Sequence, residues 1–548
     1  MRTRSPSARV IRPGMTLWQA LEATAAAHSS HRAALIAADG EITLPKLVLE
    51  ATSVDRVLRD LGVGAGDRVL VALPNSVRYA AAYFGVLRRG GVVVPVDPGL
   101  TAREVAAVAE RGAAAAIVDP RCEVTVRAAF ADARVNGGVH VYDRPRTAEL
   151  VEGPAVEAGS RDPDDTAVVF FTSGTTGDPK GVTHSHRSLV ASVMALERLH
   201  HEFFSGSVPD MMRKVVTVAR YGGRAIRAAG KQTWFTAIPF SAIGGNEVLL
   251  GSLLGGHTVV TAEGFHPRRA MEALQRHKVN VFPATPSMVS TMLDLKDFES
   301  FRLPGLLVVG LGGGPATPEL VERIQARFGC CVTVGYGSTE LGGGVLVTRI
   351  DDSDKVKQGT VGRPFPGTEV RIVDEHGVDV PVGDVGELIC RAVSLMAGYA
   401  DLPSDAHLDA DGWYHTNDLA AFDRDGNIRI AGRKDDLIIR GGNKIRPLEV
   451  ERVLEQWPEV EAAAVVGIDT PRVGQQVWAF VVPRGAGEVD REQLMRHCRA
   501  NLAPFKVPDH VRLCDSLPTT TLGKVQRHRL IALAKGEDIT SIRRPVER

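Results

Sequence analysis

The sequence predicts an α/β protein with a large N-terminal domain of α/β sheets, a β-rich subdomain inside that domain, and a small C-terminal α+β domain. Three observations support this prediction. Short apolar runs alternate with helical patterns in the first part of the chain, and short strands separated by Asp/Gly turns follow at 357–430. The alternation then returns after Gly432-Arg433. A chain of 548 residues is also too long for one hydrophobic core.

The N-terminal part shows the order strand, helix, strand. An apolar run at 68–73 ends at Pro74, a helical pattern extends to Leu87, and a second apolar run covers 91–95. This order predicts a parallel sheet. A polar connection at 144–165 then leads to a buried strand at 166–171. We expect further strands at 279–282, 306–310 and 331–335, and helices at 286–294 and 318–328.

The C-terminal part predicts a helix at 447–457, strands at 460–468 and 477–483, and a helix near 490–501. We therefore divide the chain into a domain of residues 1–433 and a domain of residues 434–548. The segment 203–232 is an additional helical excursion that carries several Arg and Lys residues. It is a lid, a partner surface or, as the default, a solvated basic helix.

The composition argues against several functions. Lys plus Arg and Asp plus Glu are both 65, so no net charge favours nucleic acid or an anionic membrane. No uncharged apolar stretch reaches the roughly 18 residues of a membrane span. The six cysteines include no Cys-x-x-Cys pair, which argues against a zinc site or a disulfide framework. We expect a cytoplasmic protein without a membrane span or a nucleic-acid partner.

A loop rich in Gly, Ser and Thr follows the strand at 166–171. Its predicted phosphate-binding residues are Thr172, Ser173, Gly174, Thr175, Thr176, Gly177 and Lys180. Glycines let backbone N–H groups converge on an anion, while the hydroxyls and the ammonium group donate to phosphate oxygens. The Gly-Lys-Ser/Thr ending of a Walker A loop is missing. The loop lies between a buried strand and a helical pattern that starts at His186, which favours an anion site over a surface loop.

The segment 171–182 resembles the signature of the adenylate-forming superfamily, which includes acyl-CoA synthetases, luciferases and the adenylation domains of peptide synthetases. Further matching segments follow in the order of the family, at 312–315, 336–340, 412–418, 432–442 and 518–525. The resemblance covers nearly the whole chain. It implies the adenylate-forming enzyme fold, with a mobile C-terminal domain. It also implies an acid–thiol ligase that uses ATP and Mg²⁺ to form an acyl-AMP and then transfers the acyl group to a thiol, with CoA as the leading acceptor.

The matching segments supply candidate nucleotide-binding residues. Tyr336 offers a ring face to adenine, and Glu340 is a hard carboxylate suited to Mg²⁺. Thr339 can donate to the α-phosphate. Asp418 resembles the ribose-binding carboxylate of the family, and Arg433 is a cation that reaches ribose or phosphate oxygens. By the same resemblance, the glycines of these segments complete the ATP/AMP site: Gly313, Gly314 and Gly337.

Lys524 matches the lysine that, in the family, bridges the carboxylate of the acid and the α-phosphate. This lysine would neutralise two anions and stabilise the transition state. With Thr339 and Glu340 it completes the predicted catalytic set. Asp435 matches the hinge position, about which the small domain rotates for the second half-reaction.

The chain departs from the family pattern at 239–245. Acyl-CoA synthetases usually place a His or aromatic residue there, whereas this chain has Ser241 or Ala242 at that position. Amino-acid adenylation domains place an Asp there, so an α-amino acid substrate is disfavoured. A milder departure is Asn417, where the family usually has Gly before the ribose-binding carboxylate.

The acid pocket of the family is lined by segments that are mostly Gly, Ala, Ser and Thr in this chain, with Asn246 and Glu247 as polar exceptions. The candidate pocket residues are Ser241, Ala242, Asn246, Gly312 and Gly335. Small side chains leave room for an aromatic or medium-length acyl group, unless the segment 203–232 fills the space.

Alternatives remain open at this point. The acceptor could be the thiol of a carrier protein, or an amine, instead of CoA. The activated group could be a non-carboxylate acid such as nitrite, for diazotisation of an aryl amine. A non-catalytic relative that kept the fold is a further alternative, although Lys524, Glu340, Asp418 and Lys180 argue against it. The sequence leaves open whether the chain forms a homodimer.

Overall fold

The computed structural model describes residues 10–28, 31–144, 159, 161–173, 179–202, 215, 219, 231–400, 408–440, 442–470, 474–485, 489–520 and 524–536. The chain divides into two compact units, residues 1–369 with 391–412 and residues 370–390 with 413–548. The predicted boundary between residues 433 and 434 falls within the second unit, and it stays a prediction. Most of the predicted excursion at 203–232 and residues 174–178 of the predicted phosphate loop lie outside the described residues.

A mostly parallel sheet forms one half of the first unit. In the described residues it has nine strands in the order β15-β14-β13-β12-β11-β9-β10-β1-β2. Their bounds are β1 (Leu35–Ala37), β2 (Gly40–Ile42), β9 (Thr233–Thr236), β10 (Thr258–Thr261), β11 (Val281–Ala284), β12 (Val308–Leu311), β13 (Cys331–Ser338), β14 (Gly343–Val347) and β15 (Arg363–Pro364). The central strands from β10 to β13 are parallel, and β14 is antiparallel to β13.

A second sheet forms the other half of this unit. Its described strands run in the order β18-β8-β7-β4-β3-β5-β6. Their bounds are β3 (Arg68–Ala72), β4 (Val92–Pro95), β5 (Ala113–Val118), β6 (Gly138–Val141), β7 (Thr166–Ser173), β8 (Pro179–Ser185) and β18 (Gly398–Tyr399). Strand β7 is parallel to β4 but antiparallel to β8, so the predicted phosphate loop connects a hairpin and does not lead directly into a helix.

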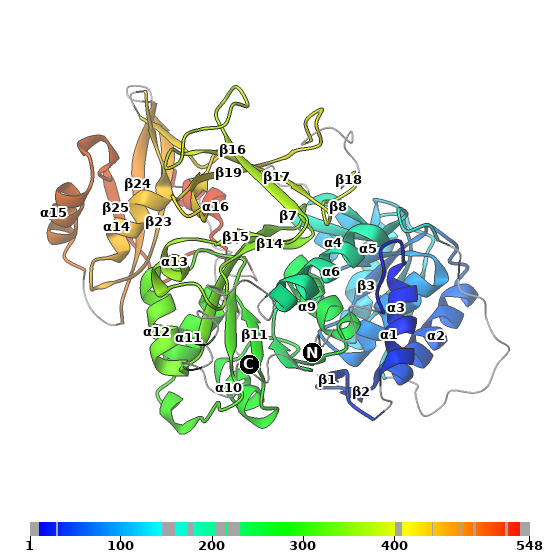
Figure 1. The fold of residues 1–548 in the computed structure, drawn as a ribbon. Coiled ribbons are helices and arrows are strands. Elements are labelled where there is room, and N and C mark those ends of the chain that lie inside the picture. Colours follow the sequence, from blue (N-terminus) through cyan, green and yellow to red (C-terminus); the bar gives the residue numbers. More distant parts are fainter. Residues whose placement is uncertain are drawn as a thin grey trace. The chain divides into compact units, whose positions relative to one another are not determined.

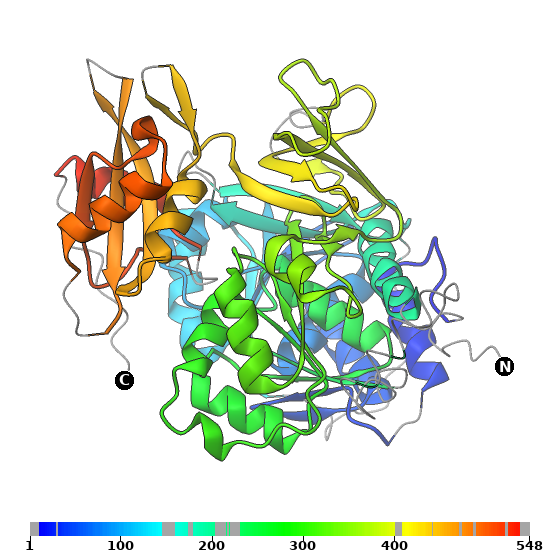
Figure 2. The same cartoon turned by 60° about the vertical axis from the view of Figure 1, so that its left-hand side comes forward.

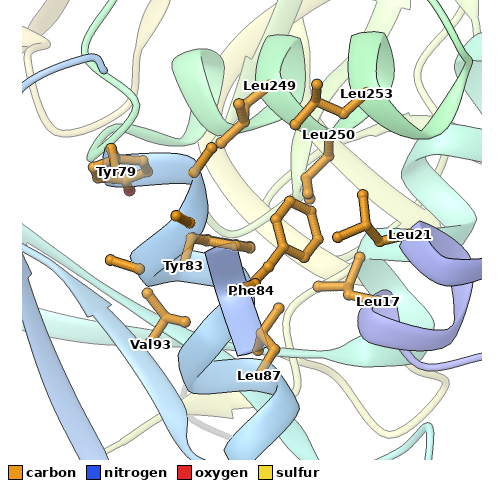
Figure 3. Packing of buried hydrophobic residues seen from close by; sticks show 14 of the residues in the cluster. Leu17, Leu21, Tyr79, Tyr83, Phe84, Leu87, Val93, Leu249, Leu250 and Leu253 are labelled. Atoms are coloured by element: carbon orange, nitrogen blue, oxygen red, sulfur yellow. The ribbon is translucent and has the colours of Figure 1, made fainter. Parts of the chain in front are cut away.

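Five helices share one hydrophobic core with strands of both sheets. These helices are α1 (Leu17–Ala27), α2 (Leu44–Asp60), α3 (Val77–Arg89), α6 (His186–Glu202) and α9 (Ile243–Leu254). Strand residues from both sheets, such as Val93 and Val259, belong to the same buried cluster. Leu250 of α9, Phe84 of α3 and Leu21 of α1 point toward one another (Figure 3). The five helices therefore form a middle layer between the sheets, and α9 is anchored on α3.

Further helices cover the outer faces of the two sheets. Their bounds are α4 (Ala102–Ala109), α5 (Glu123–Asp132), α10 (Pro267–Arg276), α11 (Pro286–Leu293), α12 (Pro318–Phe328) and α13 (Asp354–Gly359). Helices α10, α11 and α12 pack against the nine-stranded sheet (Figure 1), and α4 and α5 pack against the other one. Thr285 and Thr317 accept N-cap hydrogen bonds at α11 and α12, and a proline follows each cap. These start signals explain why both helices were predictable from the sequence.

The second unit contains two smaller sheets and three helices in its described residues. The bounds are β16 (Thr368–Val373), β17 (Gly386–Ala392), β19 (Tyr414–Phe422), β20 (Ile428–Arg433), β21 (Ile438–Arg440), β22 (Asn443–Ile445), β23 (Val460–Thr470), β24 (Gly474–Pro483), β25 (His510–Leu513), α14 (Pro447–Glu455), α15 (Arg491–Asn501) and α16 (Arg527–Ala534). Helices α14 and α15 pack on one side of the β23–β24 ribbon (Figure 2), and α16 belongs to a separate cluster with Phe480.

The predicted fold class is confirmed. The predicted strands at 279–282, 306–310 and 331–335 correspond to β11, β12 and β13, and the predicted β-rich segment contains β16, β17, β19 and β20. Across the described residues, no helix is both long enough and apolar enough to cross a membrane.

Candidate active site

Four parallel strands end at one edge of the nine-stranded sheet. Strands β9, β11, β12 and β13 are mutually parallel, so the segments that follow them emerge on the same side. These segments, together with the last residues of β13, carry Ser241 and Ala242, Gly312–Gly314 and Tyr336–Glu340. The structure thus brings together, in the first unit, predicted residues that are up to about a hundred positions apart in the sequence.

Glycines allow the backbone to turn tightly at this edge. After β12, the N–H of Gly312 donates to the carbonyl of Ala284 at 3.1 Å, and Gly313 has a φ of +77°. At the end of β13, a Cβ atom on Gly337 would lie 1.9 Å from the carbonyl oxygen of Gly343. Since β13 also bulges between Tyr336 and Gly337, only glycine fits at position 337. Tyr336 remains partly exposed beside this bulge.

The carboxylate of Glu340 is held by a distant residue. The hydroxyl of Tyr399 in β18 donates to its Oε1 at 3.1 Å, and the N–H of Met396 donates to its backbone carbonyl at 2.8 Å. Within the described part of the chain, Oε2 of Glu340 has no hydrogen-bond partner, so one hard oxygen stays available. This arrangement suits Mg²⁺, which is usually bound by one or two carboxylates together with substrate phosphates.

His184 is hydrogen-bonded to the backbone of Thr339, the residue before Glu340. Its Nε2 lies 2.7 Å from the carbonyl oxygen of Thr339, and its side chain is fully buried. Burial lowers the pKa of His184 to about 4, so the ring is neutral at pH 7 and its Nε2–H donates to Thr339. Neither His184 nor Tyr399 was identified from the sequence. A sequence signal that could have identified His184 is its position just after the predicted phosphate loop.

The described ends of the predicted phosphate loop lie opposite each other in the hairpin. Thr172 pairs with Lys180, and Ser173 pairs with Pro179. The ammonium nitrogen of Lys180 lies 5.7 Å from the ring centroid of Tyr399. Because the hydroxyl of the same tyrosine contacts Glu340, Tyr399 connects the predicted phosphate-binding lysine with the predicted metal ligand. Gly174, Thr175, Thr176 and Gly177 lie outside the described residues.

The predicted acid-pocket segment is held by α3 and by Asn75 just before this helix. Phe240 is fully buried, its N–H donates to Asn75 at 2.6 Å, and the hydroxyl of Tyr79 donates to its carbonyl at 2.9 Å. Ser241 and Ala242 follow with partly exposed side chains, and Ala242 is the N-cap of α9. Gly335 is also partly exposed.

Asn246 points into the core. It is fully buried, and its amide Nδ2 donates to the hydroxyl of Tyr83 at 3.1 Å. The amide of Asn246 is therefore already hydrogen-bonded within the protein core. The next residue, Glu247, keeps a partly accessible side chain and contacts β14.

The remaining predicted residues belong to the second unit. Asp418 and Arg433 face each other across β19 and β20, with 3.2 Å between Oδ1 and Nε. Asn417, which stands where the family usually has Gly, has a φ of +59°. Asparagine tolerates this left-handed conformation better than most residues, which explains how the substitution keeps the turn before Asp418.

Lys524 and Asp435 both have exposed side chains. Lys524 pairs with Thr520: its N–H donates to Oγ1 of Thr520 at 3.2 Å, and its carbonyl accepts from the N–H of Thr520 at 2.8 Å. Asp435 lies between β20 and β21. Its predicted hinge role stays a prediction.

Comparison with known proteins identifies the family. Residues 21–400 match the family model described as AMP-binding enzyme, and residues 449–524 match the model of the AMP-binding enzyme C-terminal domain. The chain belongs to the AMP-binding enzyme family. The predicted superfamily and enzyme class, an AMP-forming acid–thiol ligase, are confirmed by this membership and by its relatives.

The relatives cover almost the whole chain. A feruloyl-CoA synthase from Amycolatopsis sp is 32% identical over 500 residues, which cover 91% of this chain and 95% of the relative. ATP-bound MatB from Rhodopseudomonas palustris is 25% identical, with a TM-score of 0.81 over 96% of this chain and 100% of that structure. The amide bond synthetase McbA from Marinactinospora thermotolerans is 28% identical, with a TM-score of 0.81 over 94% of this chain and 99% of that structure.

Proposed function

We propose that this AMP-binding enzyme activates an aromatic or medium-length carboxylic acid with ATP and transfers the acyl group to CoA. The observation that carries the proposal is the connection through Tyr399, which places the carboxylate of Glu340 and the ammonium group of Lys180 on one side chain. A metal carboxylate next to a phosphate-binding cation is what the release of pyrophosphate requires. Membership of the family and the similarity to feruloyl-CoA synthase support the same proposal.

In the first half-reaction, an oxygen of the substrate carboxylate attacks the α-phosphorus, and the bond from that phosphorus to pyrophosphate breaks. Lys180 and the hydroxyls of the predicted phosphate loop hold the leaving phosphates, and Thr339 donates to the α-phosphate. When bound at Glu340, Mg²⁺ would neutralise phosphate charge. Lys524 positions the carboxylate against the α-phosphate, so no side chain has to act as a nucleophile.

Each part of the nucleoside has its own proposed binding residues. Tyr336 stacks on adenine, the glycines at 313, 314 and 337 let the backbone approach it, and Asp418 accepts hydrogen bonds from the ribose hydroxyls. The ion pair with Arg433 keeps the carboxylate of Asp418 oriented.

In the second half-reaction, the sulfur of CoA attacks the acyl carbonyl carbon, the bond to AMP breaks, and the thiol proton is released. Rotation at Asp435 would withdraw Lys524 between the two half-reactions.

Acid-dependent exchange of pyrophosphate into ATP tests the first half-reaction. We expect exchange with at least one acid of a panel of aromatic and medium-chain acids. Glu340→Gln should lower it by at least about tenfold, because the amide no longer binds Mg²⁺ as a carboxylate does. Glu322→Gln, on the exposed face of α12, is the matched control. An enzyme that binds ATP but shows no exchange with any acid or with nitrite would instead be a non-catalytic relative.

A second candidate function is transfer of the acyl group to an amine. The similarity to the amide bond synthetase McbA favours it, as does the small residue, Ser241 or Ala242, at the position of the usual His or aromatic residue. Formation of an amide from acid, ATP and amine, at a higher rate than the thioester with CoA, would support this candidate over CoA transfer.

A further inference from the structure

Glu247 extends from the first turns of α9 toward β14. Its Oε2 accepts a hydrogen bond from the N–H of Gly344 at 3.1 Å. A Cβ atom on Gly343 would lie 2.8 Å from the same oxygen, so glycine at this position lets the carboxylate approach the strand. Leu250 of the same helix packs toward Phe84 of α3 (Figure 3), which anchors the helix that carries Glu247.

This carboxylate lies against the strand pair that carries the adenylation residues. In the β13–β14 register, Gly344 is opposite Gly337, and Gly343 is opposite Ser338. Gly337 and Ser338, which lie opposite the two glycines beside Glu247, are therefore flanked along the chain by Tyr336 and by the turn that carries Glu340. Glu247 also belongs to the helix that begins directly after Ala242. It is thus adjacent both to the nucleotide-binding turn and to the segment predicted to line the acid pocket.

One oxygen of Glu247 is unused. In the described part of the chain, Oε1 has no hydrogen-bond partner, and no Lys or Arg forms an ion pair with the carboxylate. The side chain lies deep among protein atoms yet stays partly accessible, and burial raises its pKa from 4.5 to about 7. Buried carboxylates in folded proteins normally have a hydrogen-bonding or charged partner. A ligand that brings a donor would complete this site.

Two glycines and an aromatic ring lie near Oε1 of Glu247. A Cβ atom on Gly344 would lie 3.4 Å from Oε1 of Glu247 and 3.5 Å from Cζ of Phe365. The ring of Phe365 and the carboxylate oxygen therefore both lie beside Gly344. A single acceptor among apolar groups is how binding sites fix the orientation of a small ligand.

We propose that Glu247 is a specificity-determining residue, which selects acids that carry an ammonium or hydroxyl donor at the end remote from the activated carboxylate. Oε1 accepts the hydrogen bond of that donor, while Oε2 stays bound to Gly344. The inference rests on the proposed function, since it concerns the acid that this site activates.

The test uses pairs of acids of nearly equal shape, with and without the donor. The ammonium pairs are 4-(aminomethyl)benzoate with 4-ethylbenzoate, and 6-aminohexanoate with heptanoate. The hydroxyl pairs are 4-hydroxybenzoate with 4-methylbenzoate, and 6-hydroxyhexanoate with heptanoate. Acid-dependent pyrophosphate exchange gives kcat/KM for each acid, and the two sets of pairs distinguish a charged donor from a neutral one.

We expect the wild-type enzyme to prefer the donor-bearing member of at least one pair by about 10- to 100-fold, as for a hydrogen bond to a charged group. Glu247→Gln keeps an acceptor for Gly344 but removes the charge, so most of a preference for ammonium should be lost, mainly through KM. Glu247→Leu should reverse the preference and raise the activity toward the methyl-bearing acid. Glu322→Gln, an exposed glutamate in the same unit, should keep the preference of the wild-type enzyme.

A purely structural role gives a different result. If Glu247 only ties α9 to β14, Glu247→Gln and Glu247→Leu change both members of every pair by the same factor, and the inference is overturned. Activation of the acids by the wild-type enzyme without any donor preference also overturns it, while the proposed function stands. If no acid is activated at all, the proposed function itself fails.

Discussion

The hydroxyl of Tyr399 donates a hydrogen bond to Oε1 of Glu340 at 3.1 Å, although 59 positions separate the two residues in the sequence. The ring of the same tyrosine lies 5.7 Å from the ammonium nitrogen of Lys180. One side chain therefore orients the carboxylate proposed to bind Mg²⁺ and contacts the cation proposed to bind phosphate. Tyr399 acts in this account as a positioning residue for both.

Tyr399→Phe should weaken the use of Mg²⁺ while keeping the contact with Lys180. The variant loses the hydrogen bond to Glu340 but retains the ring, so we expect kcat of pyrophosphate exchange to fall by about tenfold. We also expect the Mg²⁺ concentration for half-maximal rate to rise. A titration with Mg²⁺ measures both. Tyr399→Leu, which also removes the ring, should in addition raise KM for ATP. An unchanged Mg²⁺ dependence in Tyr399→Phe would contradict the positioning role.

His184 should make the first unit sensitive to acid. Its pKa is lowered by burial from 6.5 to about 4, so the unfolded chain binds a proton more readily than the folded protein. The stability contributed by the neutral ring is present above pH 6.5 and is lost as the pH falls toward 4. His184→Gln cannot be protonated, and its amide still donates to Thr339. We expect the melting temperature of the wild-type protein to fall more steeply between pH 6.5 and 4.5 than that of the variant. If the melting temperatures of both proteins fall equally with pH, the lowered pKa of His184 is contradicted.

Asn417 should tolerate glycine but not alanine. Its φ of +59° costs a residue with a Cβ atom about 1 kcal/mol or more, whereas glycine adopts it freely. Asn417→Ala should therefore destabilise the second unit by about 1 kcal/mol and raise KM for ATP through the shift of Asp418. Asn417→Gly should stay close to the wild-type protein. Urea denaturation compares the two variants, and equal stability of both would show that the conformation at 417 carries no strain.

The sequence predicted the parts of the fold that depend on local patterns. Helices α11 and α12 begin at a threonine cap followed by a proline, and β12 is a short apolar run before glycines. Strand β8 was missed, and the helical pattern was expected to follow the phosphate loop. Between Lys180 and Ser185, whose burial is described, Val182 is the one fully buried apolar side chain. The alternation that identifies a strand is therefore missing, and pairing with β7 defines the strand.

The sequence predicts the motif residues of the candidate site but not the residues that hold them in position. Tyr336, Glu340 and Asp418 could be found because each lies in a recognisable segment. Tyr399 and His184 act through contacts with residues 59 and 155 positions away, which no local pattern reports. The same limit applies to the acid pocket, where Asn246 turns into the core toward Tyr83 and Glu247 turns toward Gly344.

Lys524→Ala should separate the two half-reactions. If Lys524 bridges the carboxylate and the α-phosphate, the variant loses acid-dependent pyrophosphate exchange by at least about 100-fold, the loss typical of a group that stabilises transition-state charge. It should still convert a supplied acyl-AMP to the thioester with CoA. Loss of both activities to the same extent would remove Lys524 from its assigned role in the first half-reaction.

Mass analysis of the products tests the central claim most directly. The wild-type protein is incubated with ATP, Mg²⁺, CoA and a pool of aromatic and medium-chain acids, and the masses of nucleotides and acyl products are measured. We expect AMP, pyrophosphate and the CoA thioester of at least one acid, with the acyl-AMP accumulating when CoA is left out. Formation of ADP in place of AMP, or no acyl product of any acid with or without CoA, would contradict it.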